Sequence, residues 1–235
     1  METFAWILIS VCAVLAIIFT IVRAKFGGEI ALLLKTLASF ALVASAFVGI
    51  ALLDLNSDQK LIASLIGIGL LLGMIGDILL DLKVIYDNDK IYLNSGMLSF
   101  GLGHLCYFSA FSLLATSNNT DLMMPILVSI GSAIVLTVVI MIASKGMKLD
   151  FGKYLIQTIS YSFILSFMMI YTLILAITGG ASWIVFIGML LFFLSDVVLS
   201  QQYFGGKLQN KLLIVVNHIL YYSAQILILA SLFLL

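Results

Sequence analysis

The chain has 235 residues, of which 63% are hydrophobic and 9% are charged, and its mean hydropathy is +1.26. A soluble domain is roughly half apolar and about a quarter charged, so this composition excludes one and indicates an integral membrane protein. The 11 basic and 11 acidic residues cancel, so the net charge does not predict a nucleic-acid partner. Cys12 and Cys106 lie in apolar runs and predict neither a disulfide framework nor a thiolate metal site.

Eight apolar runs follow one another along the chain, each near the ~20 residues that a helix needs to cross a bilayer. They cover residues 4–22, 29–53, 61–82, 94–115, 122–143, 153–177, 181–201 and 211–235. The runs are apolar on all sides and lack the alternation of a transmembrane β-barrel. We therefore predict an all-α, polytopic protein with eight transmembrane helices in a single transmembrane domain, residues 1–235.

The basic residues between these runs predict the orientation of the chain. Nine of the 11 bases lie in alternate loops: Arg23, Lys25, Lys83, Lys90, Lys145, Lys148, Lys153, Lys207 and Lys211. The opposite loops hold Lys60 alone. The positive-inside rule then places both termini outside the cytoplasm. The short loops are typical of a protein of a bacterial inner membrane.

Similar motifs in the two halves of the sequence indicate an internal repeat. The segment HLCYFSA, residues 104–110, matches HILYYSA, residues 218–224, and each follows a helix that ends in an aspartate motif, at Asp77 and Asp196. Earlier in each half, Lys35-Thr36-Leu37 matches Gln157-Thr158-Ile159. An offset of four helices predicts a parallel four-plus-four repeat, with halves 1–120 and 121–235. The alternative is that two helix pairs have similar packing without a repeat.

Five ionisable residues fall inside the predicted spans, where each costs ~2.5 kcal/mol or more to insert and is a functional candidate by default. They are Lys35, Asp77, His104, Asp196 and His218. A helical rise of ~1.5 Å per residue places all five in the cytoplasmic half of the membrane or near its midplane. Other hydrogen-bonding side chains lie at similar depth: Tyr107, Gln157, Tyr161, Ser195, Asn217, Tyr221, Tyr222 and Gln225. Together they predict a polar cavity that faces the cytoplasmic leaflet and suits an amphiphile.

Each of these residues also has a structural interpretation. Lys35 can extend its ammonium to the interface, or form an ion pair with an aspartate. His104 and His218 can be core histidines that bind carbonyl or tyrosine oxygens. Asp81 lies one helical turn after Asp77, and we expect it to end its helix in water.

Asp77 and Asp196 are the best candidates for catalysis, because two carboxyl groups in a low-dielectric pocket can divide into a protonated acid and an ionised base. The chain has no G-x-S-x-G motif, which disfavours a serine acyl hydrolase. A zinc site made by the two histidines and the two aspartates is disfavoured too, because its ligands would come from four separate helices without H-E-x-x-H spacing. We predict no metal and no cofactor.

Four segments resemble the signature helices of the lysoplasmalogenase-like, YhhN-type membrane family. They are LLGMIGDILLDL (71–82), FGLGHLCYF (100–108), FFLSDVVLS (192–200) and YYSAQILILAS (221–231), together with the lysine early in the second helix. The resemblance implies a hydrolase that cleaves the vinyl ether bond of lysoplasmalogens, with a lysophospholipid as substrate and membrane lipids as surroundings.

Under this interpretation, Asp77 and Asp196 share the acid and base roles, in an order that the sequence leaves open. Lys35 would hold the ionised carboxylate or contact the phosphate. Water and the glycerol head would be positioned by polar side chains of two helices: His104, Tyr107, Asn217, His218, Tyr221 and Gln225. The alternative function is a small lipid or proton-coupled transporter, which the lack of paired Gly/Pro interruptions in the third and seventh helices disfavours.

Overall fold

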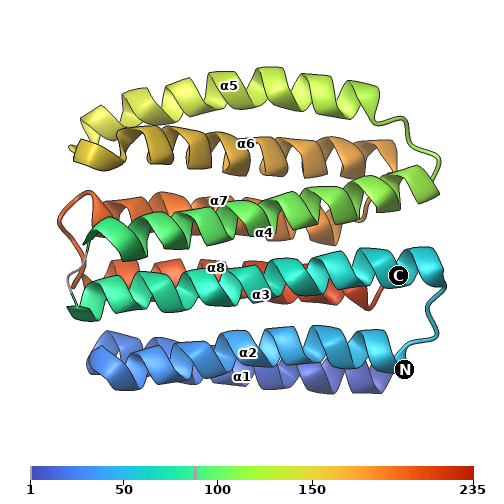
Figure 1. The fold of residues 1–235 in the computed structure, drawn as a ribbon, viewed down its shortest axis with the longest axis horizontal. Coiled ribbons are helices and arrows are strands. Elements are labelled where there is room, and N and C mark those ends of the chain that lie inside the picture. Colours follow the sequence, from blue (N-terminus) through green and yellow to red (C-terminus); the bar gives the residue numbers. More distant parts are fainter. Residues whose placement is uncertain (1, 87–88) are drawn as a thin grey trace.

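The computed structural model describes residues 2–86 and 89–235, and these residues form eight long helices without strands (Figure 1). The helices are α1 (Glu2–Lys25), α2 (Gly28–Leu52), α3 (Ser57–Tyr86), α4 (Asp89–Ser117), α5 (Met123–Gly146), α6 (Leu155–Thr178), α7 (Trp183–Tyr203) and α8 (Lys211–Leu232). A short 3-10 helix, η1 (Gly152–Tyr154), leads into α6. All eight long helices are long and apolar enough to cross a membrane, which confirms the predicted fold class.

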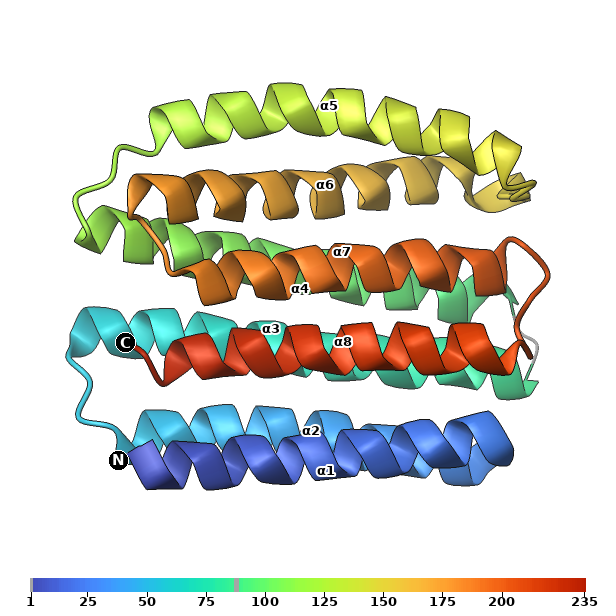
Figure 2. The ribbon, with the colours of Figure 1, turned by 180° about the vertical axis from the view of Figure 1, so that it is seen from behind.

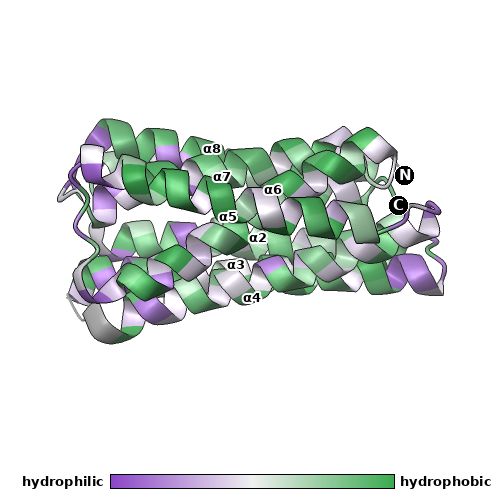
Figure 3. Ribbon diagram, turned by 90° about the horizontal axis from the view of Figure 1, so that it is seen from above, coloured by the Kyte–Doolittle hydropathy of each residue, from purple (hydrophilic) through white to green (hydrophobic). Residues whose placement is uncertain are grey.

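The helices run side by side, with the N- and C-terminal ends of the described chain at the same end of the bundle (Figures 1 and 2). The closest helix pairs are α3 with α4 and α7 with α8, while α1 and α2 cover one side and α5 lies at the opposite edge against α6. Hydrophilic residues gather toward the ends of the helices (Figure 3). The loops that hold most of the basic residues lie at the end opposite the termini. The internal repeat and the direction of insertion stay predictions.

Glycine allows α3 to lie close to α4 and α8. A Cβ atom on Gly76 would lie 2.6 Å from the ring of Phe100 in α4, and one on Gly73 would lie 2.9 Å from Nε2 of Gln225 in α8. Small residues of this kind let transmembrane helices approach closely enough for their polar side chains to meet. Asp77 follows Gly76 directly, so this close packing brings the Asp77 carboxylate within reach of α8.

Two helix boundaries differ from the prediction at the end of the bundle near Asp77. The third helix continues to Tyr86 instead of ending at residue 82, and the fourth begins at Asp89 instead of residue 94. The predicted boundaries followed hydropathy, whereas backbone hydrogen bonding continues through the polar residues of a helix end. Lys90, one of the bases used for orientation, has a side chain outside the described residues.

Candidate active site

The carboxylate of Asp77, in the C-terminal half of α3, lies at the centre of a buried polar cluster. Its Oδ1 is 3.2 Å from Nζ of Lys35 in α2. Its Oδ2 accepts hydrogen bonds from the Ser39 hydroxyl at 2.6 Å and the Tyr221 hydroxyl at 2.8 Å. Asp77 is 2% exposed and Lys35 is 6% exposed, so the ammonium does not reach the interface. The ion-pair interpretation of Lys35 is therefore confirmed, and three helices hold this carboxylate in place.

The expectation that Asp81 ends its helix in water is wrong. Asp81 is 3% exposed, and its Oδ1 lies 3.4 Å from Nζ of Lys35 and 3.9 Å from Nη2 of Arg23 in α1. The reason is that α3 continues beyond Asp81, that α2 packs against α3, and that Arg23 of α1 extends to the Asp81 carboxylate. Lys35 thus lies between two carboxylates. Arg23, which the sequence predicts to lie in a loop, adds a second cation.

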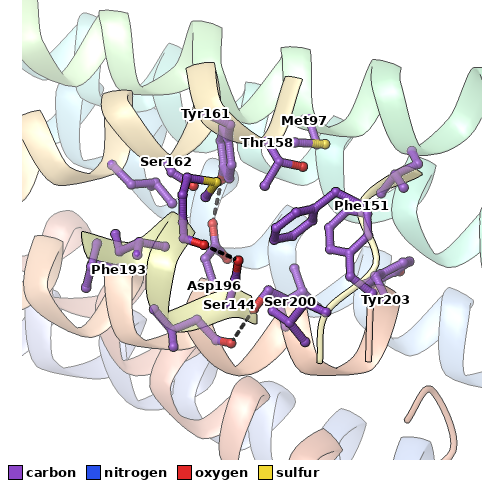
Figure 4. Close-up of a pocket in the computed structure, with 18 of the residues that line it drawn as sticks. Met97, Ser144, Phe151, Thr158, Tyr161, Ser162, Phe193, Asp196, Ser200 and Tyr203 are labelled. Carbon is purple, nitrogen blue, oxygen red and sulfur yellow. Dashed lines mark hydrogen bonds between the residues drawn. The ribbon is translucent and has the colours of Figure 1, made fainter. Parts of the chain in front are cut away.

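Asp196, in α7, has a different environment. Its Oδ2 accepts a hydrogen bond of 2.6 Å from the Tyr161 hydroxyl of α6 (Figure 4). Its Oδ1 lies 3.5 Å from the Ser195 hydroxyl. Among the described residues, no lysine, arginine or histidine forms an ion pair with it. Asp196 is half-buried, and burial costs a charged carboxylate more when no cation compensates it. The protonated form is therefore favoured more at Asp196 than at Asp77, which has Lys35 as a partner.

The two histidines make equivalent backbone contacts. The Nδ1 of His104 donates to the carbonyl of Phe100 at 2.8 Å, and the Nδ1 of His218 donates to the carbonyl of Ile214 at 2.7 Å. His218 lines the polar cavity described below, whereas His104 does not and packs edge-on against Phe192 at 4.6 Å between ring centroids. His218 therefore lines the cavity, and His104 lies behind the residues that line it.

The remaining predicted substrate-binding residues form a support for the aspartates. The Tyr107 hydroxyl donates to Oε1 of Gln225 at 3.3 Å. The Nε2 of Gln225 donates to the Tyr221 hydroxyl at 2.9 Å, and the Tyr221 hydroxyl donates to Asp77. Asn217 donates to the backbone carbonyl of Ser195, next to Asp196, at 2.7 Å. Asn217 and Tyr221 line the cavity, while Tyr107 and Gln225 lie behind Tyr221.

A polar cavity joins these groups. The space inside it that admits water-sized molecules is about 30 Å³, and the total is about 470 Å³ when gaps between side chains and open solvent are included. Its charged and hydrogen-bonding lining residues are Arg23, Lys35, Asp77, Asp81, Asp196, Gln202, Tyr203, Asn217, His218 and Tyr221. Both predicted catalytic aspartates therefore face one space, together with Arg23 and Asp81, which the sequence analysis did not include in the site. The sequence predicts a role for Arg23 only in the orientation of the chain. Ser39 is not among the predicted site residues, although it lies one turn after Lys35 on the same face of α2.

A second, mainly apolar pocket lies against the polar cavity (Figure 4). The space inside it that admits water-sized molecules is about 90 Å³, and the total is about 810 Å³ when open solvent is included. Its walls come mainly from α4, α5, α6 and α7. Five residues line both spaces: Leu80, Phe100, Asp196, Leu199 and Tyr203. Asp196 is the ionisable carboxyl group among them, so it lies at the junction of a charged cavity and an apolar pocket.

The described residues contain no group of three or more His, Cys, Asp or Glu side chains placed to hold a metal ion. Asp81 lines the same cavity, and beside it two carboxyl groups with different partners converge, those of Asp77 and Asp196, supported by hydroxyl and amide groups. Such a pair is suited to proton transfer to and from a bound molecule.

The fold and the site together define a polytopic helical membrane protein in which Asp77 and Asp196 line a polar cavity and Asp196 also lines an adjacent apolar pocket. A comparison with protein families matches residues 30–232 to the YhhN family, and the chain therefore belongs to this family. The match covers α3 to α8 and nearly all of α2, including every residue of the predicted site. Neither a search of curated proteins nor one of solved structures found a match.

Proposed function

We propose that this protein is a lysoplasmalogenase: a membrane-embedded hydrolase that cleaves the vinyl ether bond of lysoplasmalogens to a fatty aldehyde and glycerophospho-ethanolamine or glycerophospho-choline. Membership of the YhhN family supports this class of activity. The observation that carries the proposal is the position of Asp196 at the junction of the polar cavity and the apolar pocket. In a lysoplasmalogen, the vinyl ether bond joins the polar glycerol part to the hydrocarbon chain, so a chain in the pocket and a head in the cavity bring this bond to Asp196.

The surroundings of the aspartates suggest which is the acid. Asp196, which has no cationic partner among the described residues, would donate its proton to the alkene carbon next to the one that bears oxygen. This step leaves an oxocarbenium ion and an ionised Asp196. Asp77, kept ionised by Lys35, would stabilise the cation and orient the attacking water.

The second half of the reaction restores the protons. Water adds to the oxocarbenium carbon and loses one proton to a carboxylate, which gives a hemiacetal. The hemiacetal hydroxyl then loses its proton as the bond to the glycerol oxygen breaks, and that oxygen takes up a proton, which releases an aldehyde and an alcohol. The net change is the addition of one water molecule across the vinyl ether, which requires no redox partner and no covalent enzyme intermediate.

The transporter alternative receives less support. Discontinuous helices that expose backbone groups to a substrate are common in secondary transporters, whereas each of the eight helices here runs without a break over its described length. The polar cavity is lined by residues near the ends of helices, such as Arg23, Asp81 and Val84, and by Leu208 of the connection between α7 and α8. A cavity that opens at one end suits an enzyme that takes a lipid from one leaflet.

The proposal is tested with full-length protein purified in detergent and supplied with lysoplasmenyl-ethanolamine, with fatty aldehyde as the measured product. We expect Asp196→Asn and Asp77→Asn each to lower the rate by a factor on the order of 10² to 10⁴, as expected when a general acid or base is removed. Asp54→Asn is the matched control, because Asp54 is exposed between α2 and α3 at the other end of the bundle. Full activity in both folded variants would contradict the assignment, and a folded wild type that releases no aldehyde would contradict the reaction.

A further inference from the structure

The outer part of the polar cavity has charged groups that the proposed cleavage does not use. Asp81 is 3% exposed, lines the cavity, and has an Oδ2 atom without a hydrogen-bond partner among the described residues. A buried carboxylate oxygen of this kind is costly to leave unmatched, and a bound group that donates hydrogen bonds would satisfy it.

Arg23 offers the complementary group. Its nearest charged partner is Oδ1 of Asp81, at 3.9 Å from Nη2, which is beyond the usual range of a hydrogen bond. A guanidinium has five N–H donors, and its planar geometry matches the oxygens of a phosphate. Lys35 is less available for a phosphate, because its ammonium lies between Asp77 and Asp81 at 3.2 and 3.4 Å.

The charges of this part of the cavity balance. Arg23 and Lys35 contribute two positive charges, and Asp77 and Asp81 contribute two negative charges. A guest with a net negative charge would leave the cavity with an excess charge at low dielectric, whereas a guest that carries one charge of each sign would not. The cavity therefore favours a zwitterion.

We infer that Arg23 and Asp81 form a head-group site for zwitterionic lysolipids that carry a primary ammonium, such as those with phosphoethanolamine. The Arg23 guanidinium donates to the phosphate, and Oδ2 of Asp81 accepts a hydrogen bond from the ammonium. This inference rests on the proposed lysolipid substrate. All four residues line the polar cavity: Arg23 and Asp81 lie next to each other, and Asp196 also lines the apolar pocket. A lipid head at Arg23 and Asp81 and a hydrocarbon chain in the apolar pocket would therefore leave the vinyl ether near Asp196.

The inference predicts an order of preference among head groups. Phosphoethanolamine satisfies both residues. Phosphocholine has the same net charge but no N–H group for Asp81, so it binds more weakly. Phosphoglycerol has no cation, and its negative charge faces the carboxylates of Asp77 and Asp81 without compensation.

The experiment measures binding and not cleavage. Full-length protein in detergent is titrated with 1-O-alkyl lysolipids, which have a saturated ether and cannot undergo vinyl ether hydrolysis, and the dissociation constants are derived from the rise in unfolding temperature. The three lipids carry ethanolamine, choline or glycerol on the phosphate. We expect the ethanolamine lipid to bind about tenfold more tightly than the glycerol lipid, because one additional charge-assisted hydrogen bond changes the dissociation constant by about this factor.

Three variants test the contributions of Asp81 and Arg23 to this binding. Asp81→Asn should abolish the preference for the ethanolamine lipid over the glycerol lipid. Arg23→Gln should weaken the binding of all three lipids and leave the ratio of the dissociation constants for the ethanolamine and choline lipids unchanged. Asp54→Asn is the matched control and should behave as wild type.

The wild-type ratio tests the inference even if Asp81→Asn does not fold. Equal affinity of wild type for the ethanolamine and glycerol lipids would overturn the inference, and so would an unchanged ratio in folded Asp81→Asn. If selective binding is observed but the vinyl ether substrate is not cleaved, the proposed function fails while the head-group site stands.

Discussion

Under the predicted internal repeat, Asp77 and Asp196 occupy corresponding positions, yet their carboxylates have different partners. In the matched segments, Lys35 corresponds to Gln157, and the residues one turn later are Ser39 and Tyr161. Both of these hydroxyls donate 2.6 Å hydrogen bonds to the aspartate of their own half. The side chain one turn earlier differs, because a cation contacts Asp77 at 3.2 Å, whereas Gln157 is neutral and its Oε1 has no hydrogen-bond partner within the described part of the chain.

This difference shows how two similar arrangements can separate into an acid and a base. A single lysine favours the ionised form of one carboxylate, and its absence leaves the other carboxyl group to favour the protonated form. Asp196 also adjoins the apolar pocket, while Asp77 lies only in the polar cavity. The following predictions test whether the charge at residue 35, and its absence at residue 157, separates the two roles.

Replacement of Lys35 should have the largest effect. Lys35→Met removes the cation from between Asp77 and Asp81 and leaves two buried carboxylates with Arg23 alone, so we expect a loss of about 3–5 kcal/mol in the free energy of unfolding. Chemical denaturation in detergent measures this change, and Lys60→Met at an exposed position is the control. A Lys35→Met variant as stable as wild type would show that the ion pairs do not maintain this part of the bundle.

Introduction of a cation at the matched position should impair catalysis. Gln157→Lys places an ammonium one turn before Tyr161, where it can pair with Asp196 and keep it ionised. We expect the rate of aldehyde release to fall by a factor on the order of 10², the lower range for loss of a general acid. The control is Gln157→Met, which is neutral and similar in length. If the lysine and methionine variants had equal rates, charge at residue 157 would not set the role of Asp196.

Removal of one hydroxyl from each aspartate should have unequal effects. Tyr161→Phe leaves Asp196 with only the distant Ser195 hydroxyl, so its ionised product is less stabilised and the rate should fall about tenfold. Tyr221→Phe leaves Asp77 with Lys35 and Ser39, so the fall should be about threefold or less. Aldehyde release by both purified variants is compared at saturating substrate. A larger fall for Tyr221→Phe than for Tyr161→Phe would reverse the expected order.

The smallest effect is expected where Asp77 loses its other hydroxyl partner. Ser39→Ala removes one of three contacts to the carboxylate and leaves a small methyl group in its place, so we expect the free energy of unfolding to fall by about 1 kcal/mol. Ser109→Ala in α4 is a matched control, because its hydroxyl is exposed and binds only the carbonyl of Leu105. If Ser39→Ala lowered the free energy of unfolding by several kcal/mol more than Ser109→Ala, the main partner that holds Asp77 in place would be Ser39 and not Lys35.

The sequence predicted much of the fold because membrane insertion acts on local composition. Each span needs enough consecutive apolar residues, and a backbone in lipid must satisfy its own hydrogen bonds, so length and hydropathy predict helices with few alternatives. The same reasoning singled out Lys35, Asp77 and Asp196, because the cost of an ionisable group in a span is evident from its position in the sequence. It did not reveal that α3 continues past Asp81, since its last turns are polar.

The sequence by itself thus determined the number of helices, their approximate bounds and the position of Asp77 and Asp196 inside the spans, but not the burial of Asp81. Only the tertiary structure decided that Lys35 pairs with Asp77 and Asp81, that Tyr161 serves Asp196, and that Arg23 enters the cavity. The physical reason is that insertion depends on each helix separately, whereas an ion pair or hydrogen bond depends on how neighbouring helices are rotated and packed. That rotation arises from contacts between distant segments, such as Gly73 of α3 against Gln225 of α8, which no local pattern specifies.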